Sequence, residues 1–135
     1  MTENILNQYQ DFVNAVTSNA SKDKEAFLNR INELYDANVD VARLLTAGIG
    51  LASESGELLE VVKKIIFHGK PYSEENKVLL IKEAGDVLWY WANFCTALQV
   101  DPYEVIAQNV KKLEARYPGG KFEIIRSEVR AEGDI

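Results

Sequence analysis

Apolar residues recur along the chain at intervals of three and four, the spacing that brings them onto one face of an α-helix, whereas strand-like alternation is scarce. The first pattern predicts a helix from about Glu3 to Val16, followed by a polar break at Ser18–Ser21. A second helical pattern around Phe27 either stops near Asn38 or runs on. We therefore predict an all-α fold in the form of a compact helical bundle.

Three longer helical patterns follow, covering about 39–67, 73–98 and 101–117. Gly69 and Pro71 end the first of these, because glycine accepts a left-handed C-cap and proline cannot continue a helix. Ser73 is a good N-cap for the second, and Asp101 followed by proline is a strong start signal for the third. Without linkers or low-complexity segments, residues 1–135 are predicted to form a single helical domain.

Composition narrows the class of protein. The 135 residues include 15 Lys and Arg and 21 Asp and Glu, which gives a net charge of −6 and argues against binding a nucleic acid polymer or an anionic membrane through a basic face. The single cysteine excludes an internal disulfide. The N-terminus does not resemble a signal peptide, and no apolar run is long enough to span a bilayer, so we expect a soluble, cytoplasmic protein.

Two acidic pairs lie inside successive predicted helices. Glu54 and Glu57 are three residues apart, as are Glu83 and Asp86, so each pair projects from one helix face. An antiparallel hairpin would bring the two pairs together. Converging carboxylates repel one another unless cations neutralise them, and oxygen ligands favour Mg²⁺ or Mn²⁺. The alternative is that both pairs lie on solvated faces and never meet.

Each acidic pair contains a glycine, Gly56 or Gly85. A glycine within a helix costs about 1 kcal/mol relative to alanine and so calls for a reason. The spacing suggests close approach of the two helix backbones at both positions.

The ordered set Glu54-x-x-Glu57, Glu83-x-x-Asp86 and an Asn-x-x-Lys-Leu-x-x-Arg-Tyr-Pro element over 109–118 resembles the MazG-like all-α nucleoside triphosphate pyrophosphatases. The resemblance covers roughly 47–122, within a core of about 39–122 that is preceded by N-terminal helices at 3–36 and followed by a tail at 121–135. It implies Mg²⁺-dependent cleavage of a (deoxy)nucleoside triphosphate to the monophosphate and pyrophosphate. In this reaction a water that is bound to the metal, or is deprotonated by a carboxylate, attacks the α-phosphorus.

The resemblance also implies roles for individual residues. The metal ligands and catalytic residues would be Glu54, Glu57, Glu83 and Asp86, and Asn109 and Lys112 would bind the substrate, with Arg116 on the same face of their helix. Helical spacing, and not the resemblance, places Tyr90 and Asn93 on the face of Asp86 as candidate nucleotide contacts, the alternative for such a position being a place in the core. Members of this family are typically homodimers or homotetramers whose helices complete one another's bundles and sometimes one another's pockets.

One position departs from the family pattern. A second acid often precedes the first metal-binding glutamate, but here that position is Ser53, and Glu60 is an alternative source of an extra carboxylate. Two other functions stay open: a phosphoribosyl-ATP pyrophosphohydrolase, and a non-catalytic acidic adaptor or regulatory protein. A di-iron carboxylate bundle is excluded, because it needs a glutamate three residues before a histidine and Ile65 stands three before the only histidine, His68.

Overall fold

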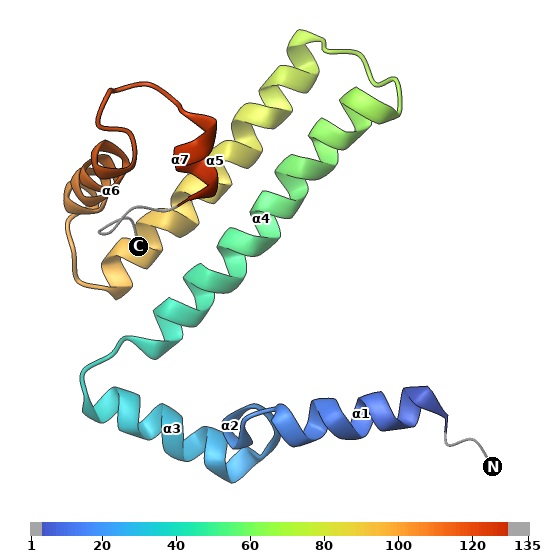
Figure 1. Cartoon of the computed structure of the whole chain (residues 1–135), viewed down its shortest axis with the longest axis vertical. Coiled ribbons are helices and arrows are strands. Elements are labelled where there is room, and N and C mark those ends of the chain that lie inside the picture. The colour runs from blue at the N-terminus through green and yellow to red at the C-terminus, as the bar shows by residue number, and fades with distance from the viewer. Residues whose placement is uncertain (1–3, 130–135) are drawn as a thin grey trace. The chain divides into compact units, whose positions relative to one another are not determined.

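The computed structural model of the chain describes residues 4–129, and its regular elements in that range are all α-helices. They are α1 (Ile5–Val16), α2 (Asn19–Lys22), α3 (Lys24–Asp36), α4 (Val41–Phe67), α5 (Glu74–Ala97), α6 (Pro102–Arg116) and α7 (Ile124–Glu128) (Figure 1). The all-α class is confirmed. The predicted helix start at Glu3 and the last residues of the predicted tail lie outside the described residues.

The chain divides into two compact units, one ending at Val41 and the other beginning at Ala42, and each is described by itself. The single domain expected from the sequence stays a prediction. Among the described residues, no helix is both long enough and apolar enough to cross a membrane.

The first unit contains α1, α2 and α3. The side chain of Asp23 accepts a hydrogen bond of 2.8 Å from the backbone N–H of Ala26 and caps α3. The predicted polar break is instead the single-turn helix α2, which packs against α3. The last turn of α3 is closed by Asn38, whose φ of 60° is left-handed, and by a bond from the Val39 N–H to the Leu34 carbonyl. This closure ends the second helical pattern before α4 begins.

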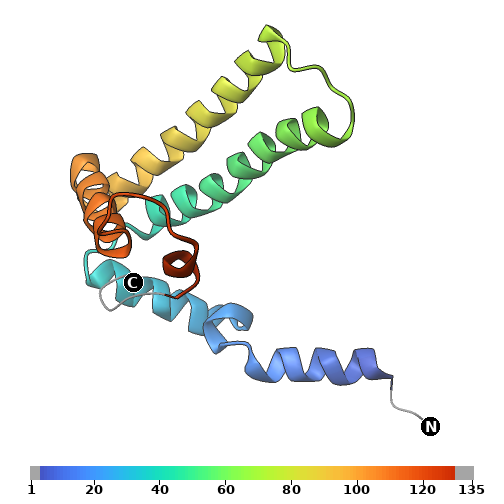
Figure 2. The same ribbon diagram turned by 45° about the horizontal axis from the view of Figure 1, so that its top comes forward.

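The second unit is built on a long antiparallel hairpin of α4 and α5 (Figures 1 and 2). Gly69 adopts a φ of 68° at the end of α4, as the sequence predicts. The Ser73 hydroxyl accepts a 3.3 Å hydrogen bond from the Asn76 N–H, and the Asn76 amide donates to the Pro71 carbonyl at 2.7 Å. These bonds fix the tight connection and therefore the register of the two helices.

A side chain of α5 packs against the backbone of α4 at Gly50, and not at Gly56; Gly85 of α5 has no such contact either. A Cβ built at Gly50 would lie 2.1 Å from ring atoms of Tyr90, whereas Cβ atoms at Gly56 and Gly85 would meet nothing within 4 Å. The prediction that Gly56 and Gly85 face the neighbouring helix of the hairpin is therefore wrong. The acids on either side of these glycines face the seam, and the glycines themselves point away from it.

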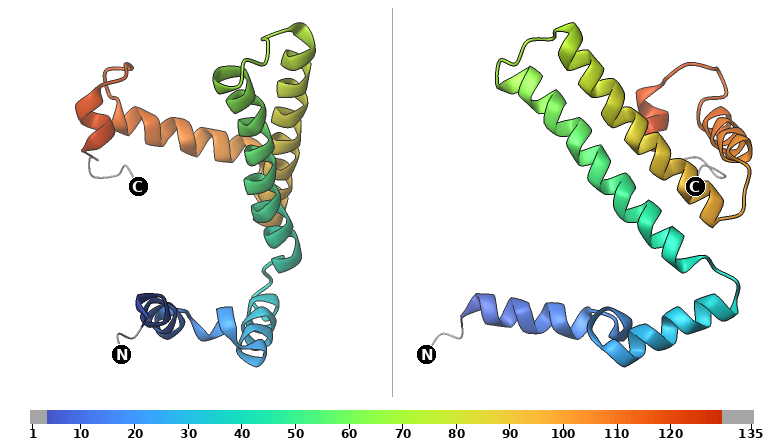
Figure 3. Two further views of the ribbon diagram at one scale, coloured as in Figure 1. Left: turned by 90° about the vertical axis from the view of Figure 1, so that its right-hand side faces the viewer. Right: turned by 180° about the vertical axis from the view of Figure 1, so that it is seen from behind.

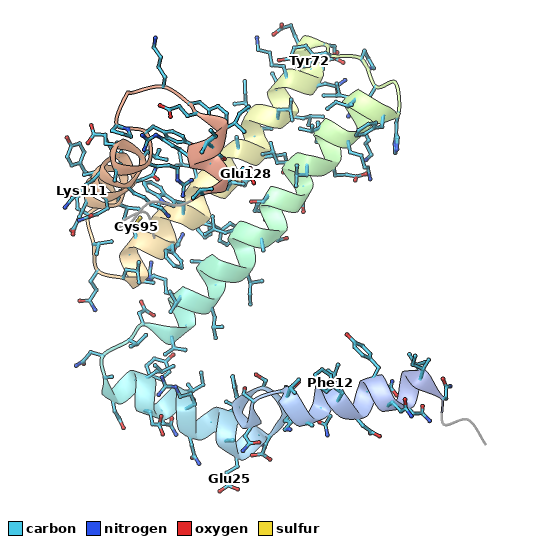
Figure 4. The ribbon with its side chains drawn as sticks, viewed as in Figure 1. Phe12, Glu25, Tyr72, Cys95, Lys111 and Glu128 are labelled. Carbon is cyan, nitrogen blue, oxygen red and sulfur yellow. The ribbon has the colours of Figure 1, made fainter. Side chains whose placement is uncertain are left out.

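Helix α6 runs crosswise to the hairpin and contacts α5, and its later turns and α7 extend away from the hairpin (Figure 3). Cys95, labelled in Figure 4, is buried near the end of α5 from which the chain turns into α6. The side chain of Asp101 caps α6 by accepting a 2.8 Å hydrogen bond from the Tyr103 N–H, which confirms the predicted start. Part of the predicted tail forms the short helix α7.

We expect Gly50→Ala to destabilise the fold by about 1–3 kcal/mol, because the added methyl overpacks against the Tyr90 ring. Gly48→Ala is the matched control: it lies on the same helix, where a Cβ meets nothing within 4 Å, and alanine should stabilise the helix by up to about 1 kcal/mol. Urea unfolding followed by circular dichroism measures both. Equal effects of the two substitutions would contradict the contact at Gly50.

Candidate metal centre

Three carboxylates from two helices converge on the seam of the hairpin. Glu54 and Glu57 come from α4 and Glu83 comes from α5, and each offers an oxygen that lies within 4.8 Å of the other two. Glu54 and Glu83 are half-buried and Glu57 is exposed. These three residues are called the acidic cluster below. The antiparallel hairpin thus brings together side chains that are 26 residues or more apart in the sequence.

Asp86 lies beside the acidic cluster without belonging to it. Its negative charge is close enough to Glu54 to contribute to the rise in that residue's pKa. The four acids singled out from the sequence are therefore neighbours, although three rather than four of them bring their oxygens within the distance of one common ion.

The pKa of Glu54 is raised above its ordinary value. Loss of hydration is the largest cause, and the negative charges of Glu57, Asp86 and Glu83 follow in that order. Both causes disfavour the ionised form of Glu54. Binding a divalent ion among them would remove the repulsion.

The donor set fits a hard divalent cation. Oxygen ligands placed 2.0–2.1 Å from an octahedral Mg²⁺ lie about 3–4 Å from one another. Oxygens already within 4.8 Å need only small rotations to reach that arrangement. The cluster contains no nitrogen or sulfur ligand, so it lacks the donors that softer transition metals prefer.

Glu60 is occupied by partners of its own. Its carboxylate contacts the ammonium of Lys63 and pairs with that of Lys64 at 3.3 Å. Hydrogen bonds from these two lysines are the main reason why the pKa of Glu60 is lowered. Glu60 is therefore paired with two lysines and does not stand free to replace the acid that is missing at Ser53.

Tyr90 and Asn93, the proposed nucleotide contacts on α5, lie on the side of the acidic cluster nearer the start of α4. The Tyr90 ring packs edge-on against Trp89, with centroids 4.7 Å apart, and covers Gly50. The Asn93 side chain accepts a 3.2 Å hydrogen bond from Arg43 and donates one of 3.1 Å to the Trp89 carbonyl. Both side chains thus connect α4 to α5.

The sequence patterns do not single out Arg43, which the structure places across from Asn93. Its spacing from Gly50 and Glu54 is seven and eleven residues, which repeats the face of α4 that carries the acids. That spacing could have placed Arg43 on the seam, but it could not have identified Asn93 as its partner.

The polar strip of Asn109, Lys112 and Arg116 lies on α6, which runs away from the hairpin (Figure 3). Lys112 and Arg116 are half-buried, and Asn109 is exposed. Within residues 4–129, Lys112 forms no ion pair with the acidic cluster.

The hairpin and α6 match a known family. The model of the MazG nucleotide pyrophosphohydrolase domain covers residues 44–120, and the chain belongs to this family. The Gene 37 protein of Mycobacterium phage L5 is 37% identical over 73 residues, an alignment that covers 53% of this chain and 64% of that protein. The chain thus spans somewhat less than two thirds of the length of this curated relative. No solved structure matches the chain.

We expect Mn²⁺ or Mg²⁺ to stabilise the folded chain, by about 2.7 kcal/mol when the ion is at 100 times its Kd. Glu83→Gln should abolish most of this effect, because it removes the ligand that α5 contributes to the acidic cluster. Glu60→Gln should retain the effect, because Glu60 is paired with lysines. Thermal unfolding with and without the ion measures this, and equal responses of the two variants would contradict the site.

The raised pKa of Glu54 determines how stabilisation by the ion, and the stability of the chain without the ion, should change with pH. Protons compete with the cation, so stabilisation by the ion should weaken as the pH falls, starting at a higher pH than for an ordinary glutamate. Without the ion, the folded chain binds the Glu54 proton more tightly than the unfolded chain does. The ionised Glu54 therefore lowers the free energy of unfolding at neutral pH, and this unfavourable contribution disappears as the pH falls through the folded-state pKa. Glu54→Gln should remove this residue's share of both dependences in unfolding curves measured from neutral to mildly acidic pH.

Proposed function

We propose that the chain is a Mg²⁺-dependent nucleotide pyrophosphohydrolase that cleaves a (deoxy)nucleoside triphosphate to the monophosphate and pyrophosphate, with Mn²⁺ able to substitute for Mg²⁺. The observation that carries this proposal is the convergence of three carboxylates from two helices inside a MazG domain. Such a site recognises the triphosphate through its charge, because a cation bound among the carboxylates attracts phosphate oxygens.

Glu54, Glu57, Glu83 and Asp86 are the proposed metal ligands and catalytic residues. When bound, Mg²⁺ would neutralise the charge that develops on the phosphate oxygens during transfer. The carboxylates hold the ion and orient a water toward the α-phosphorus, and one of them accepts the proton of that water. An oxygen–phosphorus bond forms at the α-phosphorus as its bond to the bridging oxygen breaks, and pyrophosphate leaves.

The remaining proposed roles concern the substrate. Tyr90 and Asn93 are neighbours of the acidic cluster on the hairpin and are proposed to contact the nucleoside. Asn109, Lys112 and Arg116 are proposed to bind the phosphates, where a planar guanidinium and an ammonium suit the charge and shape of the oxygens.

The position of α6 leads to a proposal about assembly. Because α6 extends away from the hairpin of its own chain, the polar strip would reach the acidic cluster of a second copy (Figure 3). Apolar residues of α6 are uncovered, among them Ile106 and Val110. We therefore propose a homodimer or homotetramer in which α6 of one copy completes the site of another.

We expect the purified chain to release pyrophosphate from at least one member of a panel of ribo- and deoxynucleoside triphosphates in the presence of Mg²⁺. Glu57→Gln and Asp86→Asn should each lower the rate on the order of 10²-fold or more, because each removes a charge that the proposed mechanism requires. Glu60→Gln should change the rate less than about threefold, since exposed ion pairs contribute little.

Three outcomes would contradict the proposal. Cleavage of phosphoribosyl-ATP alone would assign the chain to the alternative pyrophosphohydrolase function. Absence of cleavage of any triphosphate would favour a non-catalytic adaptor or regulatory protein. Full activity of both acid variants would remove the carboxylates from the mechanism.

Completion of the site by a second copy predicts complementation. Glu57→Gln and Lys112→Ala should each be nearly inactive alone, whereas a co-refolded equal mixture should recover about a quarter of wild-type activity, because one site in four then combines intact acids with an intact α6. A mixture of Glu57→Gln with Glu83→Gln is the matched control. Both of those substitutions fall in the same acidic cluster, so their mixture should recover nothing.

Recovery in neither mixture, together with a monomeric active species by light scattering, would show that the strip acts on its own chain or not at all. The hydrolytic proposal would survive that result, because the rates of the individual acid variants test it separately.

A further inference from the structure

The seam between α4 and α5 continues beyond the acids as a series of polar and small residues. On each helix the series follows one side at alternating intervals of three and four residues. Its members are Arg43, Ala47, Gly50, Glu54 and Glu57 on α4, and Glu83, Asp86, Tyr90, Asn93 and Ala97 on α5. The acidic cluster lies toward one end of this series, and the pair of Arg43 and Asn93 lies toward the other.

Hydrogen bonds fix the orientation of the Asn93 amide. An N–H at Nη1 of Arg43 donates to Oδ1 of Asn93 at 3.2 Å, and Nδ2 of Asn93 donates to the Trp89 carbonyl at 3.1 Å. A guanidinium can only donate and a carbonyl can only accept, so both neighbours require the same orientation of the amide. Its oxygen therefore faces the guanidinium.

This orientation makes the pair a surface of hydrogen-bond donors. A guanidinium has five N–H groups and no acceptor, and the amide nitrogen of Asn93 has two N–H groups. The acceptor of the pair, Oδ1 of Asn93, lies against the positive charge of Arg43. A carbonyl oxygen of a ligand suits such a surface, whereas an amino group of a ligand would have to compete with the guanidinium for Oδ1.

The pair lies about as far from the acids as a nucleobase lies from its α-phosphate. Asn93 follows Asp86 by seven residues, which is two turns on the same face of α5 and about 10 Å along the helix axis. Tyr90 lies between them, one turn from each. In a nucleotide the sugar separates the base from the α-phosphate over a similar length. With the α-phosphate at the acids, the sugar falls beside Tyr90 and the base beside Arg43 and Asn93.

The α5 side of the pair is held in one arrangement. Asn93 is half-buried and bonded to the Trp89 carbonyl, and the ring of Trp89 packs edge-on against that of Tyr90. Tyr90 in turn covers Gly50. Donors that are fixed before a ligand arrives favour the ligand whose acceptors match them.

We propose that Arg43 is a specificity-determining residue, which together with Asn93 recognises the keto oxygen of a 6-oxopurine or 4-oxopyrimidine base in the triphosphate. Guanine, uracil and thymine carry such an oxygen where adenine and cytosine carry an amino group. Arginine commonly recognises guanine through O6 and N7, whereas an amide that reads adenine uses its oxygen to accept from the N6 amino group. In this chain that oxygen accepts from Arg43. The inference rests on the proposed function, because it names the substrate class of the same site.

Binding of non-cleavable nucleotides tests this assignment without the reaction. The probes are the α,β-methylene analogues of GTP, ATP, UTP and CTP, titrated by calorimetry into the chain with Mg²⁺. We expect a keto analogue to bind about tenfold or more tightly than its amino counterpart. A preference for the GTP over the ATP analogue identifies a 6-oxopurine, and a preference for the UTP over the CTP analogue identifies a 4-oxopyrimidine. Equal affinities within both pairs, or tighter binding of the amino bases, would overturn the proposal.

Substitution of Arg43 separates recognition of the base from a general role in the fold. Arg43→Ala should lower the affinity for the preferred keto analogue on the order of ten- to a hundredfold, and that for its amino counterpart less than about threefold. Arg43→Gln, which adds an acceptor, should also lose the preference. Lys63→Ala is the matched control: it too removes a cation from α4, but Lys63 contacts Glu60, so the preference should be unchanged. An equal loss for all four analogues in Arg43→Ala would overturn the proposal.

The same measurements distinguish this proposal from the proposed reaction. Selective binding of a keto analogue, with no pyrophosphate released from the parent triphosphates, would support the role of Arg43 and contradict hydrolysis. Cleavage of triphosphates together with equal affinity for keto and amino bases would support hydrolysis and overturn the role of Arg43. Absence of binding of all four analogues would overturn both.

Discussion

The hairpin of α4 and α5 holds carboxylates close to one another at its seam, and the rest of the structure has to accommodate that arrangement. Packing alone would place apolar side chains at these positions, yet Glu54 and Glu83 are half-buried there and Glu57 lies beside them. Loss of hydration, followed by the negative charges of the three neighbouring acids, raises the pKa of Glu54, so the ionised form of this carboxylate is disfavoured at the seam. The rest of the hairpin must supply enough stabilisation to hold the acids in place.

That stabilisation comes from both ends of the seam. At the tip, Gly69, Ser73 and Asn76 fix the connection through a left-handed cap and two side-chain hydrogen bonds. On the other side of the acids, Tyr90 packs on Gly50, and Arg43 reaches Asn93 across the seam. The carboxylates are thus held between a capped turn and an aromatic contact, an arrangement that fixes the site before any ion or substrate arrives.

Much of this arrangement could be predicted from the sequence because it is encoded locally. The caps at Ser73 and Asp101 and the left-handed Gly69 depend on neighbouring residues alone, and the spacing of the acids places each pair on one helix face. The rotation of each helix about its axis is not encoded in the same way. That is why the prediction for the glycines is wrong: they stand between the acids in the sequence, but on a helix they lie about half a turn away from Glu54 and Glu83.

The position of α6 could not be predicted either, because the loop between α5 and α6 permits many crossing angles and few apolar contacts select among them. Few side chains of the described residues are buried. Among the described residues, Cys95 is the largest side chain that is fully buried, and no aromatic ring is. A domain of this size normally buries roughly two thirds of the surface of its unfolded chain around a core of large side chains. Helices with apolar stripes but no such core obtain their stability from whatever covers those stripes, so in the proposed oligomer folding, assembly and completion of the site are parts of one equilibrium.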